Sequence, residues 1–450
     1  MSAAEVDAVV IGAGIAGLAA ATTLQASGCE VVVVDPSDRP GGVMRTDHVN
    51  GYVVERGPNT SLIKGPMQAF LASRGLLEAV EPAKTEGQRR YLVRDGALVP
   101  VPTSTLGFAT SPLLSTRAKL RMLAEPFIRR GKPEAESVAE FLGRRLGSDV
   151  VDSLVGPFLT GVYAGDENRL GAEAVFPGLT RHEERFGSIV VGAALSSFSR
   201  GEGKALRGSY GGAGGFGRFA RQLADQLGEP PALGSRVVGL GRDDSRWRVE
   251  IESPTGDMTL SARRVVVATP SLEAANLMRG VSGDVAAALE AIHYAPVASV
   301  PIGVDRDKVR EGVSGFGFLV PRTEQRSLLG CLYMSRLFPS RAPQGKELLH
   351  CMIGGTRWPE VVHASEHEIL SRVYEDLDAI LGLDVEPAPL GMAVWPRAIP
   401  QPDRDHGARM RWAQGRLAEA RGLALAGCYT GGVGVSDSLV SGVEAARSLI

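Results

Sequence analysis

Apolar residues near the start of the chain, between Asp7 and Asp35, fall into three blocks separated by glycines and polar residues. A short β-branched run, Val9–Ile11, comes first, and a longer segment rich in alanine and leucine extends to about Ser27. A second β-branched run, Val31–Val34, completes the pattern. Short β-branched runs on either side of a longer Ala/Leu segment are typical of a strand, a helix and a second strand. The pattern therefore predicts a βαβ unit at the start of the chain.

The lack of charge between Asp7 and Glu30 also permits a membrane span, because the run is long enough to cross a bilayer. Two features argue against that interpretation. The run is dense in Gly, Ala and Thr, and its flank carries Glu5 and Asp7 where a secretory signal would carry basic residues. We therefore interpret it as a buried βαβ unit.

Three glycines with G-x-G-x-x-G spacing, Gly12, Gly14 and Gly17, lie at the turn between the first strand and the helix. In such a turn the first glycine allows the sharp bend and the second lets backbone approach a pyrophosphate. The third lets helix and strand pack closely. The N–H groups of the helix N-terminus then face the phosphates, and Asp35 can accept hydrogen bonds from ribose hydroxyls. The combination predicts dinucleotide binding.

Apolar runs in the rest of the chain predict two further groups of strands. A meander and a buried strand are expected at Arg236–Val238, Trp247–Glu252 and Arg264–Pro270. Five or six strands between Pro296 and Met352 indicate a separate, largely antiparallel domain. A last strand, Leu423–Gly427, precedes a glycine-rich turn and a helix through Gly442. We assign it to the N-terminal unit, which makes the dinucleotide-binding domain discontinuous.

Length and composition add limits to this picture. At 450 residues the chain exceeds one ordinary core, so two or three domains are expected, and its 44% hydrophobic and 22% charged residues are typical of a globular protein. The formal net charge of −2 argues against a general nucleic-acid binder. The four cysteines lie far apart without a CxxC pair, and the seven histidines show no ligand spacing. No metal site is predicted, and we interpret the cysteines as reduced residues of the core.

The stretch from about Leu98 to Lys132 interleaves apolar side chains with basic ones. Between Arg117 and Lys132, six cations accompany a single acid, Glu125. A basic amphipathic segment of this kind can lie on an anionic membrane surface. It can equally be an ordinary helix on the protein's own core, and the residues alone leave both interpretations open.

Another segment with two interpretations is Gly208–Gly217, which opens a predicted helix over Arg218–Leu227. It could be a phosphate-binding loop, but it lacks the G-K-[ST] ending of a P-loop. A structural turn is therefore favoured. A further helix is predicted from Ser137 to Leu146.

Several motifs together resemble one enzyme family. The dinucleotide unit is followed by R-x-G-G at Arg39–Gly42 and by G-P-N at Gly57–Asn59. Further motifs are Arg90–Leu92 (RYL), Thr160–Asp166 (TGVYAGD), Phe316–Pro321 (FGFLVP) and Gly431–Asp437 (GGVGVSD). In this combination the chain is similar, over essentially its whole length, to the oxygen-dependent protoporphyrinogen oxidases of the FAD-dependent amine oxidase and desaturase superfamily. It departs from the family pattern at Asp35, Pro402 and Ser436, where the family has glutamate, an aromatic residue and asparagine.

The resemblance implies an α/β fold with three parts. These are a discontinuous, Rossmann-type FAD-binding domain, a mixed-sheet substrate domain and a helical domain that faces a membrane. We place the FAD-binding parts at 1–85, 205–290 and 405–450. The helical part, which also contributes to the substrate site, is placed at 86–204, and the substrate-binding sheet at 291–404.

FAD rather than NAD is the cofactor that the resemblance implies. Residues expected to contact it are Gly12, Gly14, Ile15, Ala16, Gly17, Asp35, Gly41, Gly42, Gly57, Pro58, Asn59, Val237, Val238, Val433, Gly434, Val435 and Ser436. Arg90 matches the position that meets a substrate propionate, and the other expected substrate residues are Gly161, Phe316, Leu319, Leu332 and Met352. Composition alone would place the apolar ones in an ordinary core. No catalytic residue is assigned, because the flavin carries the reaction.

The implied activity is oxidation of protoporphyrinogen IX to protoporphyrin IX in haem biosynthesis, a six-electron reaction with O2 as acceptor and H2O2 as product. Coproporphyrinogen III oxidation to coproporphyrin III stays open as an alternative, and another flavin amine oxidase or desaturase reaction is a weaker one. Amine oxidases carry G-E-x-T where this chain has Gly427–Thr430, and carotenoid desaturases lack TGVYAGD. From the resemblance we also expect a cytoplasmic protein, peripheral on the inner face of the cell membrane. A homodimer and transfer of product to ferrochelatase are further expectations.

Overall fold

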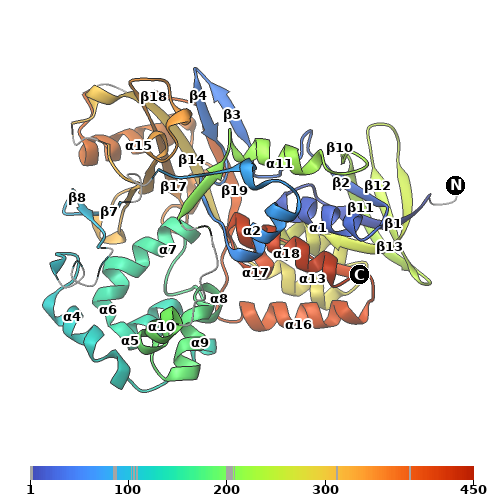
Figure 1. Cartoon of the computed structure of the whole chain (residues 1–450), viewed down its shortest axis with the longest axis horizontal. Coiled ribbons are helices and arrows are strands. Elements are labelled where there is room, and N and C mark those ends of the chain that lie inside the picture. Colours follow the sequence, from blue (N-terminus) through green and yellow to red (C-terminus); the bar gives the residue numbers. More distant parts are fainter. Residues whose placement is uncertain are drawn as a thin grey trace.

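The computed structural model describes residues 4–450 apart from 85–88, 103, 105–106, 108–109, 199–205, 207, 311–312 and 385–386. Its parts separate clearly in space (Figure 1). The elements of the two chain ends form one domain on the right of that view, a second sheet lies at the upper left, and a group of helices lies at the lower left. The predicted three-part α/β fold is confirmed.

The first domain is built on a seven-stranded sheet whose centre is β1 (Ala4–Ile11). This strand pairs in parallel with β2 (Val31–Asp35) on one side and with β13 (Met258–Val267) on the other. Beyond β13 lie β20 (Leu423–Leu425), in parallel, and the antiparallel pair β12 (Arg246–Glu252) and β11 (Arg236–Asp243). Because β20 joins the sheet from the other end of the chain, the domain is discontinuous, as predicted.

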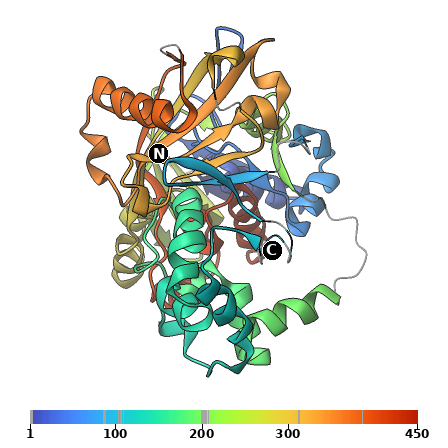
Figure 2. The same cartoon turned by 90° about the vertical axis from the view of Figure 1, so that its left-hand side faces the viewer.

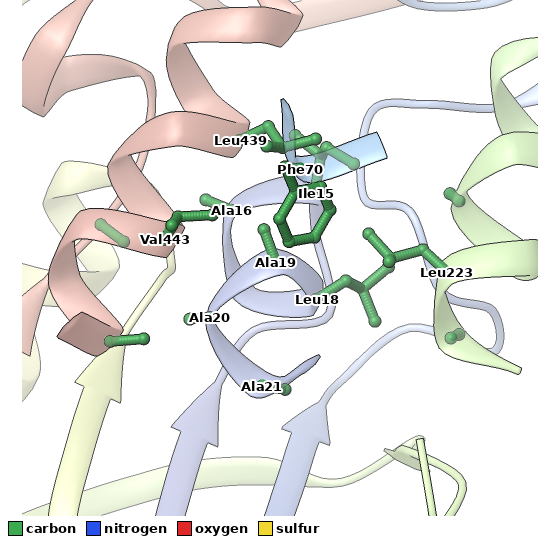
Figure 3. Packing of buried hydrophobic residues seen from close by; sticks show 14 of the residues in the cluster. Ile15, Ala16, Leu18, Ala19, Ala20, Ala21, Phe70, Leu223, Leu439 and Val443 are labelled. Carbon is green, nitrogen blue, oxygen red and sulfur yellow. The ribbon is translucent and has the colours of Figure 1, made fainter. Parts of the chain in front are cut away.

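Helix α1 (Ile15–Ala26) crosses from β1 to β2 and is buried on most of its circumference. It packs between α18 (Val435–Arg447) and α11 (Phe216–Ala224), with Ala16 beside Val443 and Leu18 beside Leu223 (Figure 3). A Cβ on Gly442 would overlap the carbonyl oxygen of Ala16. The alanines of α1 and this glycine therefore let the two helices approach closely.

The second sheet has eight strands, with order β18-β14-β17-β16-β15-β7-β8 and with β19 also paired to β14. Its strands are β14 (Tyr294–Asp305), β17 (Lys346–Gly354), β16 (Leu328–Tyr333), β15 (Gly317–Leu319), β7 (Arg90–Arg94), β8 (Ala97–Pro100), β18 (Ala388–Pro389) and β19 (Ala393–Pro400). Helix α15 (Glu366–Leu381) covers one face, where Ile369, Val373 and Leu377 pack against alternate strand residues. The other face is turned toward the rest of the molecule.

Two details of this sheet differ from the sequence-based expectation. Between Pro296 and Met352 the described residues form four strands instead of five or six, and the sheet reaches eight through β7, β8, β18 and β19. The hairpin of β7 and β8 belongs to this sheet, although 86–204 was assigned to the helical domain. The reason is that β7 pairs in parallel with β15, a partner distant in the chain, and the sequence pattern carries no signal for such pairing.

The helical region lies below the second sheet (Figure 2) and contains the predicted helix α5 (Val138–Leu146). Ser137 and Glu140 form a capping box at its start. Its other members are α4 (Thr116–Leu123), α6 (Ser148–Val150), η5 (Val151–Val155), α7 (Gly156–Tyr163), α8 (Ala172–Val175), α9 (Pro177–Phe186) and α10 (Ile189–Phe198). In the part of the chain that the structure describes, no helix combines the length and the apolar character needed to cross a membrane.

Between the two sheets lies a hairpin of β3 (Thr46–Val49) and β4 (Tyr52–Glu55). Beside it, the glycine-rich segment forms β9 (Ser209–Gly212) and a turn into α11. The first amides of α11 are occupied by side chains, since Phe216 N donates to Glu55 Oε1 (3.0 Å) and Gly217 N donates to Thr46 Oγ1 (2.9 Å). The interpretation of this segment as a structural turn is confirmed.

Candidate functional site

The glycines of the first turn divide into two that the chain's own packing requires and one that it does not. Gly12 has a φ of +108°, and a Cβ there would lie 2.8 Å from the carbonyl oxygen of Ala268. A Cβ on Gly17 would overlap the carbonyl oxygen of Gly12. Gly14, by contrast, has an ordinary φ of −68°, and a Cβ there would meet no atom within 4 Å. Gly14 therefore faces open space, where a ligand can approach the backbone.

Two helix N-termini close to this turn carry no side-chain cap. Gly14 is the N-cap of α1 and Gly434 is the N-cap of α18, and neither helix start has a capping side chain. Ile15 and Ala16 follow in the first turn of α1, and Val435 and Ser436 in that of α18. Uncapped first-turn amides and the positive ends of two packed helices favour an anionic group.

Asp35 holds the glycine turn in place. Its Oδ2 accepts a hydrogen bond from Ala13 N (2.7 Å) and its Oδ1 accepts one from Ser37 N (2.8 Å), in a buried position. Each carboxylate oxygen keeps a second lone pair. Contact of Asp35 with a ribose stays a prediction, and the structure adds an anchoring role that the sequence pattern did not indicate.

The R-x-G-G segment lies directly against the glycine turn. Gly41 N donates to the carbonyl oxygen of Ala13 (2.8 Å), and Gly42 approaches so closely that its Cβ would lie 3.4 Å from Gly14 Cα. Both glycines have positive φ, +111° and +57°. Arg39 holds this segment, because its guanidinium donates to the carbonyl oxygens of Met44 (3.2 Å) and Gly42 (2.9 Å).

The G-P-N segment continues the same surface. A Cβ on Gly57 would overlap the carbonyl oxygen of Val43, so this segment packs tightly on the one before it. Asn59 is buried, its Nδ2 lies 3.5 Å from the carbonyl oxygen of Gly57, and its Oδ1 has no partner among the described residues. Pro58 lies between Gly57 and Asn59 in the chain. An unpaired buried amide oxygen is costly, so this site is suited to a ligand that brings a donor.

The remaining expected cofactor residues lie at the two ends of the same surface. Val237 and Val238 are the second and third residues of β11 and lie at a bulge. The chain just before them is next to the end of β2, where Ser235 N donates to the carbonyl oxygen of Asp35 (3.1 Å). At the other end, Ser436 Oγ accepts from Lys64 N (3.4 Å), and Lys64 Nζ forms an ion pair with Asp437. Val433 is half-buried against the helical region. This arrangement is suited to an extended dinucleotide, and the open space at Gly14 is where we expect its pyrophosphate.

The face of the second sheet opposite α15 carries four of the expected substrate residues. Strand register places Leu319 opposite Gly330, and Gly330 opposite Met352, while Leu332 lies opposite Gly317 and Gly317 opposite Arg90. Directly opposite residues share a face, so Arg90, Leu319, Leu332 and Met352 lie on one wall, away from α15.

Exposure sets these residues apart from their neighbours. Leu332 is the half-buried residue of an otherwise buried β16, and Met352 is half-buried between buried residues of β17. Phe316 and Leu319 are also half-buried. Gly161 of α7 closes one side of the wall, since a Cβ there would lie 2.6 Å from Leu319 Cδ2. The wall is thus apolar and only partly covered, which composition alone could not predict.

Arg90 stands at the edge of this wall. Its Cζ lies 4.6 Å from the centroid of the Phe316 ring, and among the described residues it has no carboxylate within ion-pair distance. Burial against its neighbours lowers the pKa of Arg90, but its guanidinium is still solvent-accessible and charged. A cation without a carboxylate partner beside an apolar wall is suited to a ligand with an apolar body and a carboxylate.

The sequence analysis missed two polar residues of the wall, His350 and Ser299. His350 lies opposite Leu332, and its Nε2 is hydrogen-bonded to Ser299 Oγ (2.7 Å). Burial, with a smaller effect from the charge of Arg56, lowers the pKa of His350 to about 3. This imidazole is therefore neutral at ordinary pH, and we assign it no proton transfer. Only the strand register could have placed it here.

Comparison with known proteins decides the family. The model of the family described as flavin-containing amine oxidoreductase matches residues 15–450. The chain belongs to this family. It is 32% identical to "Protoporphyrinogen oxidase 2, chloroplastic/mitochondrial" of Arabidopsis thaliana, covering 98% of this chain and 93% of that protein. It is 28% identical to "Coproporphyrinogen III oxidase" of Bacillus subtilis (strain 168), covering 99% and 98%.

A solved structure shares the fold of this chain. A crystal structure from Exiguobacterium sp. 255-15 superposes with a TM-score of 0.82 at 23% identity, covering 100% of this chain and 99% of that one. As a flavin-containing amine oxidoreductase, the chain is an FAD-dependent oxidoreductase, and FAD is its cofactor. FAD is the dinucleotide that the surface around Gly14 would hold.

Proposed function

We propose that this flavoenzyme oxidises a porphyrinogen, with protoporphyrinogen IX as the first candidate and coproporphyrinogen III as the second. The observation that carries the proposal is the apolar wall of Leu319, Leu332 and Met352, which ends at Arg90, a cation without a carboxylate partner among the described residues. A porphyrinogen has an apolar macrocycle and propionate groups, and it matches both features. The names of the relatives from Arabidopsis and Bacillus support the same substrate class.

In this proposal the chain's own residues bind, orient and shield the substrate. Arg90 pairs with a propionate and thereby sets which edge of the macrocycle enters the site. The apolar wall excludes water from the ring. When bound, FAD would supply the hydride acceptor, with O2 as the final electron acceptor. Six hydrogens leave protoporphyrinogen IX in total, and three O2 become three H2O2, so the reaction balances.

The test is a porphyrin fluorescence assay on purified, yellow protein with each porphyrinogen. We expect formation of fluorescent porphyrin with one H2O2 released for each O2 consumed. The preferred substrate is the one with the higher kcat/KM. No porphyrin from either compound above the rate without enzyme would contradict the proposal. An amine-dependent release of H2O2 would then favour an amine oxidase.

A second part of the proposal concerns a membrane. On α4 and the following turn, Leu120, Leu123 and Phe127 expose 63%, 75% and 89% of their surface. Glu125, the acid of this stretch, is fully buried and ion-paired with Arg145, so it does not offset the cations outside. Exposed apolar side chains beside cations support contact with an anionic lipid surface. Localisation at the inner face of the cell membrane, homodimer formation and transfer to ferrochelatase stay predictions.

Vesicle binding tests the membrane contact. Arg117, Arg129 and Lys132 are exposed, and at roughly 1 kcal/mol per cation they should strengthen binding to anionic vesicles by about a hundredfold over neutral ones. The difference should shrink with salt. Phe127→Ser should weaken binding, whereas Met258→Ser, which removes an exposed apolar side chain of the FAD domain, should not. Equal sedimentation with neutral and anionic vesicles would contradict the contact.

A further inference from the structure

Glu55 and Arg341 form a buried ion pair between the two sheets, and neither belongs to a motif discussed above. Glu55 is 2% exposed and Arg341 is 0% exposed. Arg341 Nη1 donates to Glu55 Oε1 (3.0 Å), and its Nη2 donates to the carbonyl oxygen of Gly212 (2.6 Å). Arg341 comes from the connection between β16 and β17 of the substrate sheet, whereas Glu55 ends β4. The pair therefore links the substrate sheet to the hairpin between the domains.

The other bonds of Glu55 extend this link to α11. Its Oε2 accepts from Thr46 Oγ1 (2.7 Å), and its Oε1 accepts from Phe216 N at the start of α11 (3.0 Å). Thr46 Oγ1 also accepts from Gly217 N (2.9 Å). One carboxylate thus joins a guanidinium, a hydroxyl and a helix N-terminus, each of which complements its negative charge.

This junction lies between the two segments that line the cofactor surface. The R-x-G-G segment leads into β3, which starts at Thr46, and the G-P-N segment begins two residues after Glu55. Helix α11 also packs on the first of these segments, since a Cβ on Gly41 would lie 2.9 Å from Ala220 Cβ. A shift of the hairpin relative to α11 would therefore move both segments together.

We propose that Glu55 and Arg341 are positioning residues for FAD: their ion pair fixes the hairpin on which both cofactor segments are mounted. Neither residue is expected to touch FAD. Removing the charge of Glu55 leaves a buried guanidinium without its main counter-charge, and the hairpin then relaxes away from α11. Affinity for FAD falls because binding must restore the original arrangement.

A second buried pair provides a matched control. In the helical region, Arg145 Nε donates to Glu125 Oε1 (2.6 Å), and both residues are 0% exposed. Glu125 also accepts from a hydroxyl, Ser188 Oγ, and from Ile189 N at the start of α10 (3.0 Å). The two junctions are similar, since each arginine also has a second carboxylate, Glu81 for Arg341 (3.5 Å) and Glu183 for Arg145 (3.2 Å). No residue of the second junction is among those expected to contact the cofactor.

The experiment compares Glu55→Gln with Glu125→Gln. FAD is removed from each protein and titrated back, with the quenching of flavin fluorescence and the fine structure of the visible spectrum as readouts. We expect the Kd for FAD to rise at least tenfold in Glu55→Gln and to stay within twofold of the wild type in Glu125→Gln. Thermal unfolding of the apo proteins should show comparable losses in Tm. An unchanged Kd in Glu55→Gln, or an equal rise in both variants, would overturn the proposal.

A milder pair of variants covers the case in which Glu55→Gln does not fold. Thr46→Val keeps the ion pair but removes the hydroxyl between Glu55 and α11, and Ser188→Ala does the same at the control junction. We expect the Kd for FAD to rise about threefold or more in the first and to remain unchanged in the second. Equal Kd values for FAD in Thr46→Val and Ser188→Ala would overturn the proposal. Since the readout is FAD binding, failure of the porphyrinogen assay would leave this inference standing.

Discussion

Replacing Gly14 with valine should give a folded protein that has lost its FAD. A Cβ at this position meets no protein atom within 4 Å, and the φ of −68° is open to any residue, so the chain itself tolerates the change. The valine methyl groups would fill the space that the pyrophosphate needs beside α1. We expect FAD affinity to fall at least a hundredfold, about 2.8 kcal/mol, and the yellow colour to disappear.

The control for this change is Gly283→Val. Gly283 is the first residue of α13 (Gly283–Glu290), and a Cβ there also meets nothing within 4 Å. This variant should remain yellow, with circular dichroism and unfolding behaviour close to those of Gly14→Val. Gly12→Val and Gly17→Val are unsuitable, because their side chains would collide with the chain's own backbone. A Gly14→Val protein with a full complement of FAD would place the pyrophosphate elsewhere.

Replacing Arg90 with alanine should raise KM for the preferred porphyrinogen by about ten- to a hundredfold. An arginine–carboxylate contact is worth roughly 1.5–3 kcal/mol, which corresponds to that range. The contact forms on binding and persists in the transition state, so kcat should change far less than KM. Steady-state kinetics would separate the two parameters, and the visible spectrum would check that FAD is retained.

Arg90→Lys is the matched variant. Lysine keeps the charge but lacks the planar fork of the guanidinium and its stacking on Phe316, where Arg90 Cζ lies 4.6 Å from the ring centroid. We expect the KM of Arg90→Lys to lie between those of the wild type and Arg90→Ala. Wild-type kinetics for Arg90→Ala on both porphyrinogens would remove Arg90 from the site, and the apolar wall alone would then orient the substrate.

Local signals predicted the elements that frame the cofactor surface. Apolar periodicity and glycine spacing located the end of α1 and both ends of β2 to within one residue, and they located β1, although it begins five residues before Val9. The helix predicted from Ser137 to Leu146 is α5, whose capping box the structure adds. The missing G-K-[ST] ending correctly classified the segment before α11 as a turn. Each of these signals depends on residues adjacent in the chain, where propensity and capping act directly.

Features that depend on distant pairing were not predictable. The β7–β8 hairpin was assigned to the wrong part, because its partner β15 is chosen by packing across the sheet. The Glu55–Arg341 ion pair joins residues 286 positions apart, and no spacing rule connects them. For Asp35, the motif indicates a ligand contact, whereas its two bonds to backbone amides depend on the loop geometry.

The discontinuity of the FAD domain has a consequence for how the enzyme is made. The cofactor surface combines the start of α1 at Ile15 with the start of α18 at Val435, so about 420 residues are synthesised between its two halves. At roughly 5–20 residues per second, the ribosome needs about 20 to 80 seconds to supply the second half. During that interval β13 lacks its neighbour β20 and α1 lacks the cover of α18. FAD therefore cannot guide the early folding of its own domain, and we expect flavin insertion to be a late event that follows the synthesis of α18.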